Sequence, residues 1–420
     1  MNGWHQFATA VLWMVGSTVS PLSAQTNARG IGPSLTLVAP SNKSDLSVAA
    51  PLPGGTAIAL DKAWQLVEID HPEPAIPAQI STMISGDSAA SSASAQLLAI
   101  IPPQAAASES RRFRLETAET AKQNAELFAW RDIDNTSLGL WEREQPVLVY
   151  NHGEVVNENI PASDHRRARG CYIHPVWGLN GEILTDDFPR DHYHHHGIFW
   201  AWPHVGIDGQ EHDLWMYDTI KQRFVRWLHR DTGPVASSLG VENGWFVDDR
   251  QVMIERVSLR IFKASDDARV IDISLTWIPM AQAITLQGAE DKSYGGLTIR
   301  FAPGSRQETV ITVPDGRTEQ DLPDTPLAWA DLTTRFGGAE SASGAALLVH
   351  PGHPDFPPTW LTRHYGPLCV GWPGIEPRTF PPGQPIRLDY RIWIHKSAVD
   401  VSRLSEAYEG YSAAAKVVWE

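Results

Sequence analysis

RQVMIERVSLRIF at residues 250–262 and IRLDYRIWIH at residues 386–395 are the stretches that decide the fold class. Within them, VSLRIF (257–262) and RLDYRIWIH (387–395) carry an apolar residue at every second position. That period of two is typical of half-buried antiparallel strands. Further β-branched or aromatic runs, separated by Gly- and Pro-rich turns, occupy residues 146–153, 170–177, 197–202, 269–280, 295–302 and 345–351.

Outward from these stretches, the pattern predicts an all-β protein. We expect a large antiparallel two-sheet sandwich over residues 127–420, with Val399–Ala415 as the best helix candidate. Weaker strand signals predict a small β-sandwich domain over residues 46–115. A flexible polar lead-in, residues 25–45, is expected before this domain, and a linker, residues 116–126, after it.

Residues 1–24 have the pattern of a signal peptide. The apolar run Ala8–Val19 is too short to span a bilayer, and the small residues Ser23 and Ala24 precede Gln25 as a plausible cleavage site. No later segment reaches the roughly 18 consecutive apolar residues of a spanning helix. We therefore expect an exported protein, periplasmic or extracellular, with no transmembrane segment after cleavage.

Charge and composition limit the classes of partner. The formal net charge of −15 argues against nucleic acid, because a phosphate-binding surface needs an excess of Lys and Arg. The chain has 17 Trp, and exposed indoles provide flat surfaces on which sugar rings stack. Cys171 and Cys369 are too few for a disulfide framework or a Cys-based zinc site, and the sequence leaves open whether they pair.

The densest polar cluster lies between Asp186 and Trp215 and contains the run HYHHH at residues 192–196. On a strand, His192, His194 and His196 would face one side and His195 the other. Imidazole is a proton shuttle near neutral pH and a common metal ligand, so His192, His194 and Asp187 are the candidate ligands if a divalent metal is bound. The spacing matches no strict metal signature, and each histidine taken singly could also be a hydrogen-bonded core residue.

Two further polar groups follow along the chain. Lys292, Tyr294 and Arg300 surround a Gly pair that would allow backbone to approach a ligand, or would form a hairpin turn. His353, Trp360, Arg363 and Tyr365 lie in a Pro-rich stretch that could rim a cleft, or could be a well-packed surface loop.

These motifs together resemble the bacterial PmoA-like family, which carries the label "methane oxygenase PmoA". The resemblance runs from about Leu46 to His395 and rests on YIHP (172–175), ILTDDFP (183–189), DHYHHHGIFWAW (191–202), DKSYGGLTIRF (291–301), HPGHPDFP (350–357) and YRIWIH (390–395). It implies that the site includes Asp187, His192, His194, His195, Asp213, Trp215, Lys292, Tyr294, Arg300, His353, Trp360, Arg363 and Tyr365, whereas His196 stands where the family pattern has Arg. The family is similar in general form to supersandwich proteins that act on carbohydrates.

The function expected from this pattern is that of an exported carbohydrate-active enzyme of the lyase, hydrolase or epimerase type. His192, His194 or His195 would be the general base or acid, and Asp187 or Asp213 would orient the imidazole. Tyr294 or Lys292 would supply the complementary proton or stabilise developing negative charge. The expected substrate-binding residues are His174, Trp215, Arg300, His353, Trp360, Arg363 and Tyr365. A non-catalytic glycan-binding protein and a metal-dependent oxygenase are the alternatives, and each reading requires the three polar groups to meet in space.

Overall fold

The computed structural model describes residues 35–40, 43–54, 56, 58, 62–85, 92–104, 110–118, 127–305 and 307–420. The predicted signal peptide, residues 1–24, lies outside the described residues, as do most of the expected lead-in and most of the expected linker. Among the described residues, no helix is both long and apolar enough to cross a membrane.

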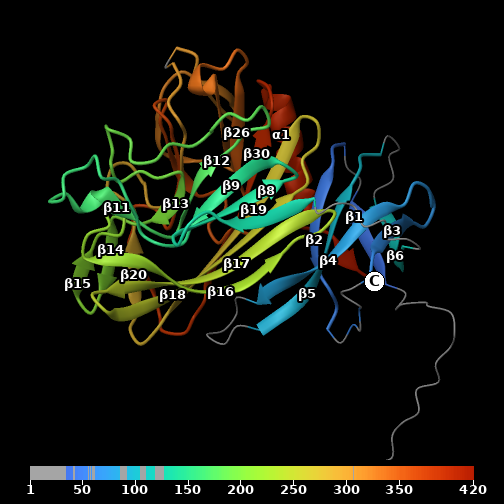
Figure 1. Ribbon diagram of the computed structural model, residues 1–420, viewed down its shortest axis with the longest axis horizontal. Helices are drawn as coiled ribbons and strands as arrows, with labels where there is room; N and C mark the ends of the chain where they lie inside the picture. The colour runs from blue at the N-terminus through green and yellow to red at the C-terminus, as the bar shows by residue number, and fades with distance from the viewer. Residues whose placement is uncertain are drawn as a thin grey trace, which may run out of the picture.

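Two nine-stranded antiparallel sheets form a large sandwich (Figure 1). The first has the order β24 (Leu322–Pro326), β27 (Thr359–Thr362), β28 (Pro367–Gly371), β21 (Gly296–Arg300), β13 (Ile198–Ala201), β12 (Tyr172–Val176), β9 (Gln145–Asn151), β8 (Ser137–Glu142) and β7 (Phe128–Asp132). The second has the order β16 (Ile220–Asp231), β17 (Ala236–Val247), β18 (Arg250–Phe262), β19 (Ala268–Pro279), β30 (Ile386–His395), β26 (Ser343–Val349), β25 (Trp329–Thr334), β22 (Val310–Val313) and β23 (Gly316–Thr318). The predicted all-β, two-sheet sandwich is confirmed.

Alternating side chains hold the two sheets together. In β18, Val257, Leu259 and Ile261 are fully buried in the core between the sheets, and in β19 Ile271 and Ile273 join them. Burying an aliphatic side chain of this size contributes about 1.5–3 kcal/mol. The period of two seen in the sequence is therefore the physical cause of the face-to-face packing.

The N-terminal part forms one hydrogen-bonded sheet of seven strands around a core of its own. Its order is β2 (Leu46–Pro51), β5 (Ser92–Ile101), β4 (Ile76–Ser85), β3 (Trp64–Glu68), β6 (Ser110–Thr117), β1 (Thr36–Pro40) and β31 (Val418–Trp419). Strand β1 lies within the expected lead-in and buries Leu37 and Ala39. Its partners are β6 on one side and β31, from the far end of the sequence, on the other.

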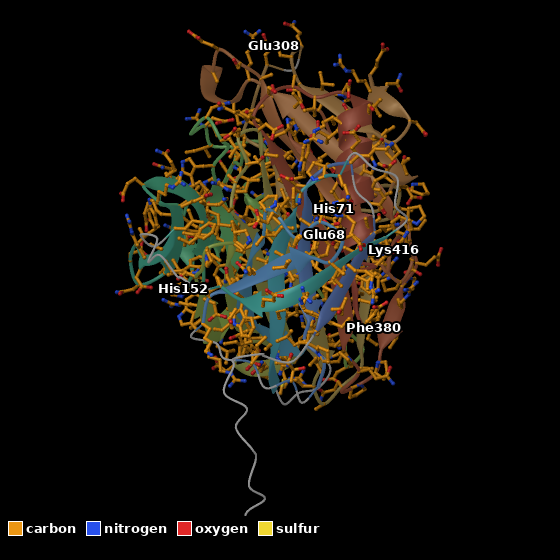
Figure 2. The ribbon with its side chains drawn as sticks, turned by 90° about the vertical axis from the view of Figure 1, so that its right-hand side faces the viewer. Glu68, His71, His152, Glu308, Phe380 and Lys416 are labelled. Carbon is orange, nitrogen blue, oxygen red and sulfur yellow. The ribbon has the colours of Figure 1, made fainter. Side chains whose placement is uncertain are left out.

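The remaining elements cover the edges of the sandwich. The helix α1 (Val401–Ala414) begins at Asp400, whose side chain accepts from the N–H of Arg403, and it packs on β1, β2 and β26. A four-stranded sheet contains β15 (Gln210–His212), β14 (His204–Ile207), β20 (Ile284–Gln287) and β29 (Arg378–Phe380), and β10 (Val155–Val156) pairs with β11 (Ala168–Arg169). Short 3-10 helices occupy His165–Arg167 and Phe336–Gly338. Figure 2 views the N-terminal sheet, with Glu68 and His71, in front of the large sandwich.

Candidate functional site

The histidine-rich segment lies in the connection between β12 and β13, residues 177–197. Its backbone forms turns, in which the N–H of His192 donates to the carbonyl of Pro189 and the N–H of His195 donates to the carbonyl of His192. The prediction that the histidines alternate between the two faces of a strand is wrong. The turns bring three imidazoles together and direct His196 into the interior, because a turn does not keep the two-residue period of a strand.

His192, His194 and His195 form a compact group of rings. The ring of His192 stacks on that of His195, with centroids 4.6 Å apart and an interplanar angle of 11°, and the ring of His194 stands edge-on to His195 at 4.7 Å. His192 also stacks on Tyr365, which lies between β27 and β28, at 5.3 Å and 9°. The first and third polar groups of the sequence therefore meet.

Trp215 connects the histidines to the second polar group. Its ring is perpendicular to that of His195 at 5.8 Å and contacts Tyr294 at 4.8 Å and Phe199 at 5.1 Å. The indole is only 5% exposed, so it forms a wall of the site and offers no open face for stacking on a ligand.

Arg300, the last residue of β21, is the buried cation of the site. Its side chain is 4% exposed, and its Nη2 donates to both oxygens of Asp191 at 3.1 and 3.2 Å. Its Nε lies 3.9 Å from Oδ2 of Asp186, and its guanidinium carbon lies 4.9 Å from the centroid of the Tyr365 ring. Nε and Nη1 are buried without a hydrogen-bond partner among the described residues. Two donors of a buried cation are therefore left for a ligand or water.

A pocket of about 550 Å³ opens beside this arginine. Asp186, Asp191, Arg300 and Tyr365 line it together with residues of the segments 187–190, 302–309 and 364–366 and with Leu332. His192 adjoins the pocket, because its ring stacks on Tyr365 and its Nδ1 lies 3.0 Å from Oδ2 of Asp191, but the described residues that line the pocket include none of the three histidines.

Burial keeps the inner imidazoles uncharged. It lowers the pKa of His194 to about 3, with the neighbouring His192 adding to the effect. Burial and the charges of the neighbouring histidines and Arg300 hold the pKa of His195 well below its ordinary value. The Nδ1 atoms of His194 and His195 are buried without a partner among the described residues. The ring group therefore contains two neutral imidazoles, each with a nitrogen that has no partner among the described residues.

The comparisons with known proteins place the chain in a family. The model of a "family of unknown function (DUF6807)" matches residues 140–409, which is well over half of the chain. The chain belongs to the DUF6807 family. No curated protein matches it. The DUF6807 region contains every residue of the site described above.

Within the DUF6807 region, Asp187 does not join the three histidines. It is partly buried, and its Oδ2 accepts from the hydroxyl of Tyr172 at 2.7 Å while its Oδ1 lies 2.7 Å from Nδ1 of His196. Burial raises the pKa of Asp187 to about 6. The predictions that Asp187 orients a catalytic imidazole of the three-histidine group, and that it shares a metal with His192 and His194, are wrong, because both oxygens are engaged away from those rings. No group of three or more His, Cys, Asp or Glu among the described residues is placed to hold a metal ion.

Three other predicted residues lie around the DUF6807 site. Asp213 accepts from the N–H of Met216 at 2.8 Å, and its charge adds to burial in raising the pKa of Tyr294. Lys292 is exposed at the turn before β21, and the Nδ1 of His174 pairs with the hydroxyl of Thr185 at 3.0 Å. None of them lines the pocket beside Arg300.

The Pro-rich stretch of the DUF6807 region is divided between the site and the core. Trp360 is fully buried in β27 and donates to the carbonyl of Leu327, so the prediction that it stacks on a sugar ring is wrong. His353 is buried between Trp372 and Tyr390, and this separate aromatic group does not touch the three histidines. Arg363 lies 3.5 Å from Asp321 near the site. Tyr365 alone of the four contacts the histidines.

Two carboxylates of the DUF6807 site, Asp186 and Asp191, were not among the site residues expected from the sequence, although Asp186 was one of the carboxylates available there for a catalytic pair. Both lie in the histidine-rich segment, so composition indicates their neighbourhood. Which of the acidic residues there faces Arg300 depends on the turns between β12 and β13, which have no periodic signal.

Proposed function

We propose that this chain is an exported carbohydrate-active enzyme that moves protons with the imidazoles of His192, His194 and His195. The observation that carries the proposal is the continuous stack of His195, His192 and Tyr365 ending on the guanidinium of Arg300, at the border of the pocket. General acid–base catalysis needs an unprotonated nitrogen within reach of the substrate, and the site supplies several. Export rests on the signal-peptide pattern of residues 1–24.

His192 is the best placed of the three to exchange a proton with a substrate. Its side chain is 36% exposed, and the carboxylate of Asp191 lies 3.0 Å from its Nδ1. A carboxylate in that position orients the ring and stabilises the imidazolium that forms when the ring accepts a proton. Asp191 therefore takes the role that the sequence had suggested for Asp187 or Asp213, and Tyr365 provides a nearby hydroxyl.

The charges favour lyase or epimerase chemistry over hydrolysis. Glycoside hydrolysis uses two free carboxyl groups on either side of the scissile bond. Asp187 and Asp213 are engaged with Tyr172 and Met216, and Asp186 and Asp191 both flank the same guanidinium. Proton abstraction needs one base and a donor for the developing negative charge, and Arg300 has unpaired N–H groups for that purpose.

The two alternatives receive less support. A glycan-binding protein would present indoles as open platforms, whereas Trp215 and Trp360 are buried. A metal-dependent oxygenase would need several ligands directed at one point. Both carboxylate oxygens of Asp187 are engaged by Tyr172 and His196, so Asp187 is not available as a ligand beside the three histidines.

The first test is the replacement of His192 by Gln in the mature protein. Turnover of a glycan panel, assayed with and without a chelator, should fall by about 10²–10⁴-fold, the usual contribution of one general base. His204→Asn, which removes an exposed histidine paired with Glu211 outside the site, is the matched control and should keep full turnover. Unchanged turnover in the His192 variant, or turnover abolished by the chelator, would count against the proposal.

A further inference from the structure

We infer that the pocket beside Arg300 binds two adjacent hydroxyl groups of an uncharged sugar ring, with Asp186 and Asp191 as acceptors and the guanidinium as donor. The inference deepens the proposed function and rests on it for the class of ligand. It adds the part of the ligand that is recognised and the charge that the ligand carries.

The geometry around Arg300 fits one hydroxyl between each carboxylate and the guanidinium. Nε and Oδ2 of Asp186 are 3.9 Å apart, too far for a direct hydrogen bond. A hydroxyl oxygen about 2.9 Å from each of them would bridge the gap, accepting from Nε and donating to Asp186. The unpaired Nη1 and the carboxylate of Asp191, which is 48% exposed, offer a second hydroxyl the same combination of donor and acceptor.

The charges of the pocket oppose an anionic ligand. Arg300 is flanked by two carboxylates, so a sugar carboxylate approaching its free N–H groups would also face Asp186 and Asp191. A like-charge approach at this distance is unfavourable. A hydroxyl both donates and accepts, so it satisfies both carboxylate and guanidinium without added charge. The two carboxylates differ in their pKa: contacts with His192 and Arg300 hold the pKa of Asp191 below its ordinary value although burial opposes the shift, whereas burial raises the pKa of Asp186.

The size of the pocket suits a single sugar ring with room for a substituent. Its volume of about 550 Å³ is within the range of small-molecule sites, which is about 300–1,000 Å³. The ring of Tyr365 is already in contact with His192 and Arg300, so we do not expect it to stack on the bound sugar ring. Hydrogen bonds, and not aromatic stacking, would therefore provide the selectivity of this pocket.

Direct binding measurements on the mature protein test the inference without relying on turnover. Calorimetry would compare methyl glycosides of glucose, galactose and mannose with glucuronate, and then each bound sugar with its singly deoxygenated analogues. We expect a neutral glycoside to bind, two deoxygenations at adjacent carbons to weaken binding at least about 10-fold each, and raised salt to leave the affinity unchanged. Tighter binding of glucuronate that is lost at high salt, or no binding of any neutral glycoside, would overturn the inference.

Two variants tie the binding to this pocket. Asp186→Asn and Arg300→Lys should each weaken binding of the neutral glycoside by about 10-fold or more, because the first removes the charged acceptor and the second keeps the charge but removes the Nε and Nη1 donors of the planar guanidinium. Asp208→Asn is the control, since Asp208 is also an aspartate paired with an arginine, Arg250, at 2.8 Å, and it does not line the pocket. Because Arg300 is buried, the melting temperature of the Arg300→Lys protein is measured first. The side chain of Asp186 is more exposed than that of Arg300, so the Asp186→Asn protein decides the test if the Arg300→Lys protein does not fold. Unchanged affinity in the Asp186 variant would contradict the inference.

The outcomes separate this inference from the proposed function. If neutral sugars bind and the variants weaken that binding as expected, but no glycan is turned over, the inference holds and the proposed enzymatic activity is contradicted. If turnover depends on His192 but the pocket binds glucuronate selectively, the proposed enzymatic activity holds and the inference is contradicted.

Discussion

His395 of β30 and Asp331 of β25, on either side of β26 in the second sheet, form a buried pair. The Nε2 of His395 lies 2.9 Å from Oδ1 of Asp331, and its Nδ1 lies 2.6 Å from the carbonyl oxygen of Ser397. Both ring nitrogens thus face acceptors, an arrangement that suits the doubly protonated ring. Burial by itself lowers the pKa of His395, but the charge and hydrogen bond of Asp331 raise it above the ordinary value.

The replacement His395→Gln should destabilise the protein more at about pH 5.5 than at about pH 9. The folded-state pKa lies above the unfolded value of about 6.5. The stabilisation is therefore fully present below that value and is lost as the pH rises through the folded-state pKa. Breaking a buried pair costs about 3–5 kcal/mol where the pair is charged.

Urea unfolding at the two pH values measures this difference. His204→Asn, which breaks an exposed pair with Glu211, is the control and should cost less than about 1 kcal/mol. The same loss of stability at both pH values in the His395 variant would mean that the ring is not charged in the folded protein.

Four strands of the second sheet share one carboxylate. Glu255 of β18 accepts from Gln222 of β16 at 2.8 Å, from Asn243 and Trp245 of β17 at 2.9 and 2.7 Å, and from Trp277 of β19 at 3.0 Å. Gln222 in turn accepts from the buried Arg169 at 2.9 Å. This network lies inside the sandwich and links the sheet to the wall of the site, because the guanidinium of Arg169 packs over Phe199.

The replacement Glu255→Gln should cost about 3 kcal/mol or more of unfolding free energy. The amide group has the same shape, but it puts two N–H donors where four donors already converge. Chemical unfolding monitored by Trp fluorescence measures the loss. Glu154→Gln, which alters an exposed pair with Lys221, is the control. A Glu255 variant as stable as the control would show that the four donors do not depend on a charged acceptor.

Strands were predictable where one periodic signal decides them. The stretches at 250–262 and 386–395 are β18 and β30, and the predicted helix over 399–415 contains α1. Strand β1 was missed because five residues in a polar stretch carry little pattern, and its partners β6 and β31 are remote in sequence. For the connection between β12 and β13 the sequence allowed only a conditional expectation, that the histidines would alternate if they lay on a strand, because composition does not distinguish turns from strands without knowledge of hydrogen-bond partners.

The membership of the site was partly predictable for the same reason. Tyr365 contacts His192, as the clustering of polar residues suggested, while Arg300 reaches the group through Tyr365 and Tyr294 reaches it through Trp215. Trp360 was misassigned because a Trp in a Pro-rich stretch looks the same in sequence whether it faces solvent or the core. Its burial follows from the pairing of β27 with β24 and β28, which only the fold determines.

At the scale of the whole molecule, buried neutral histidines should make the protein sensitive to acid. Burial lowers the pKa of His194 to about 3 and that of His353 to about 4, and it holds those of His195 and His196 well below the ordinary value. These groups take up protons on unfolding once the pH is below their unfolded value of about 6.5. Stability should therefore fall as the pH is lowered from about 6.5 toward 4.

The unfolding free energy measured between about pH 7.5 and pH 4.5 tests this expectation. Asp187, whose pKa burial raises to about 6, and His395, whose pKa Asp331 raises, work in the opposite direction, but the buried histidines whose pKa is lowered outnumber these two groups. A double variant, His194→Asn with His353→Asn, should show a shallower dependence on pH than the parent protein. A parent protein whose stability is constant over this range would contradict the low pKa values.

The pairing of β31 with β1 has a consequence for biosynthesis. One edge of β1, near the start of the described residues, has no strand beside it until residues 418–419 have been made. The N-terminal sheet is therefore the first to be synthesised and the last to be completed. For the whole duration of translation its open edge would need protection from pairing with other nascent chains.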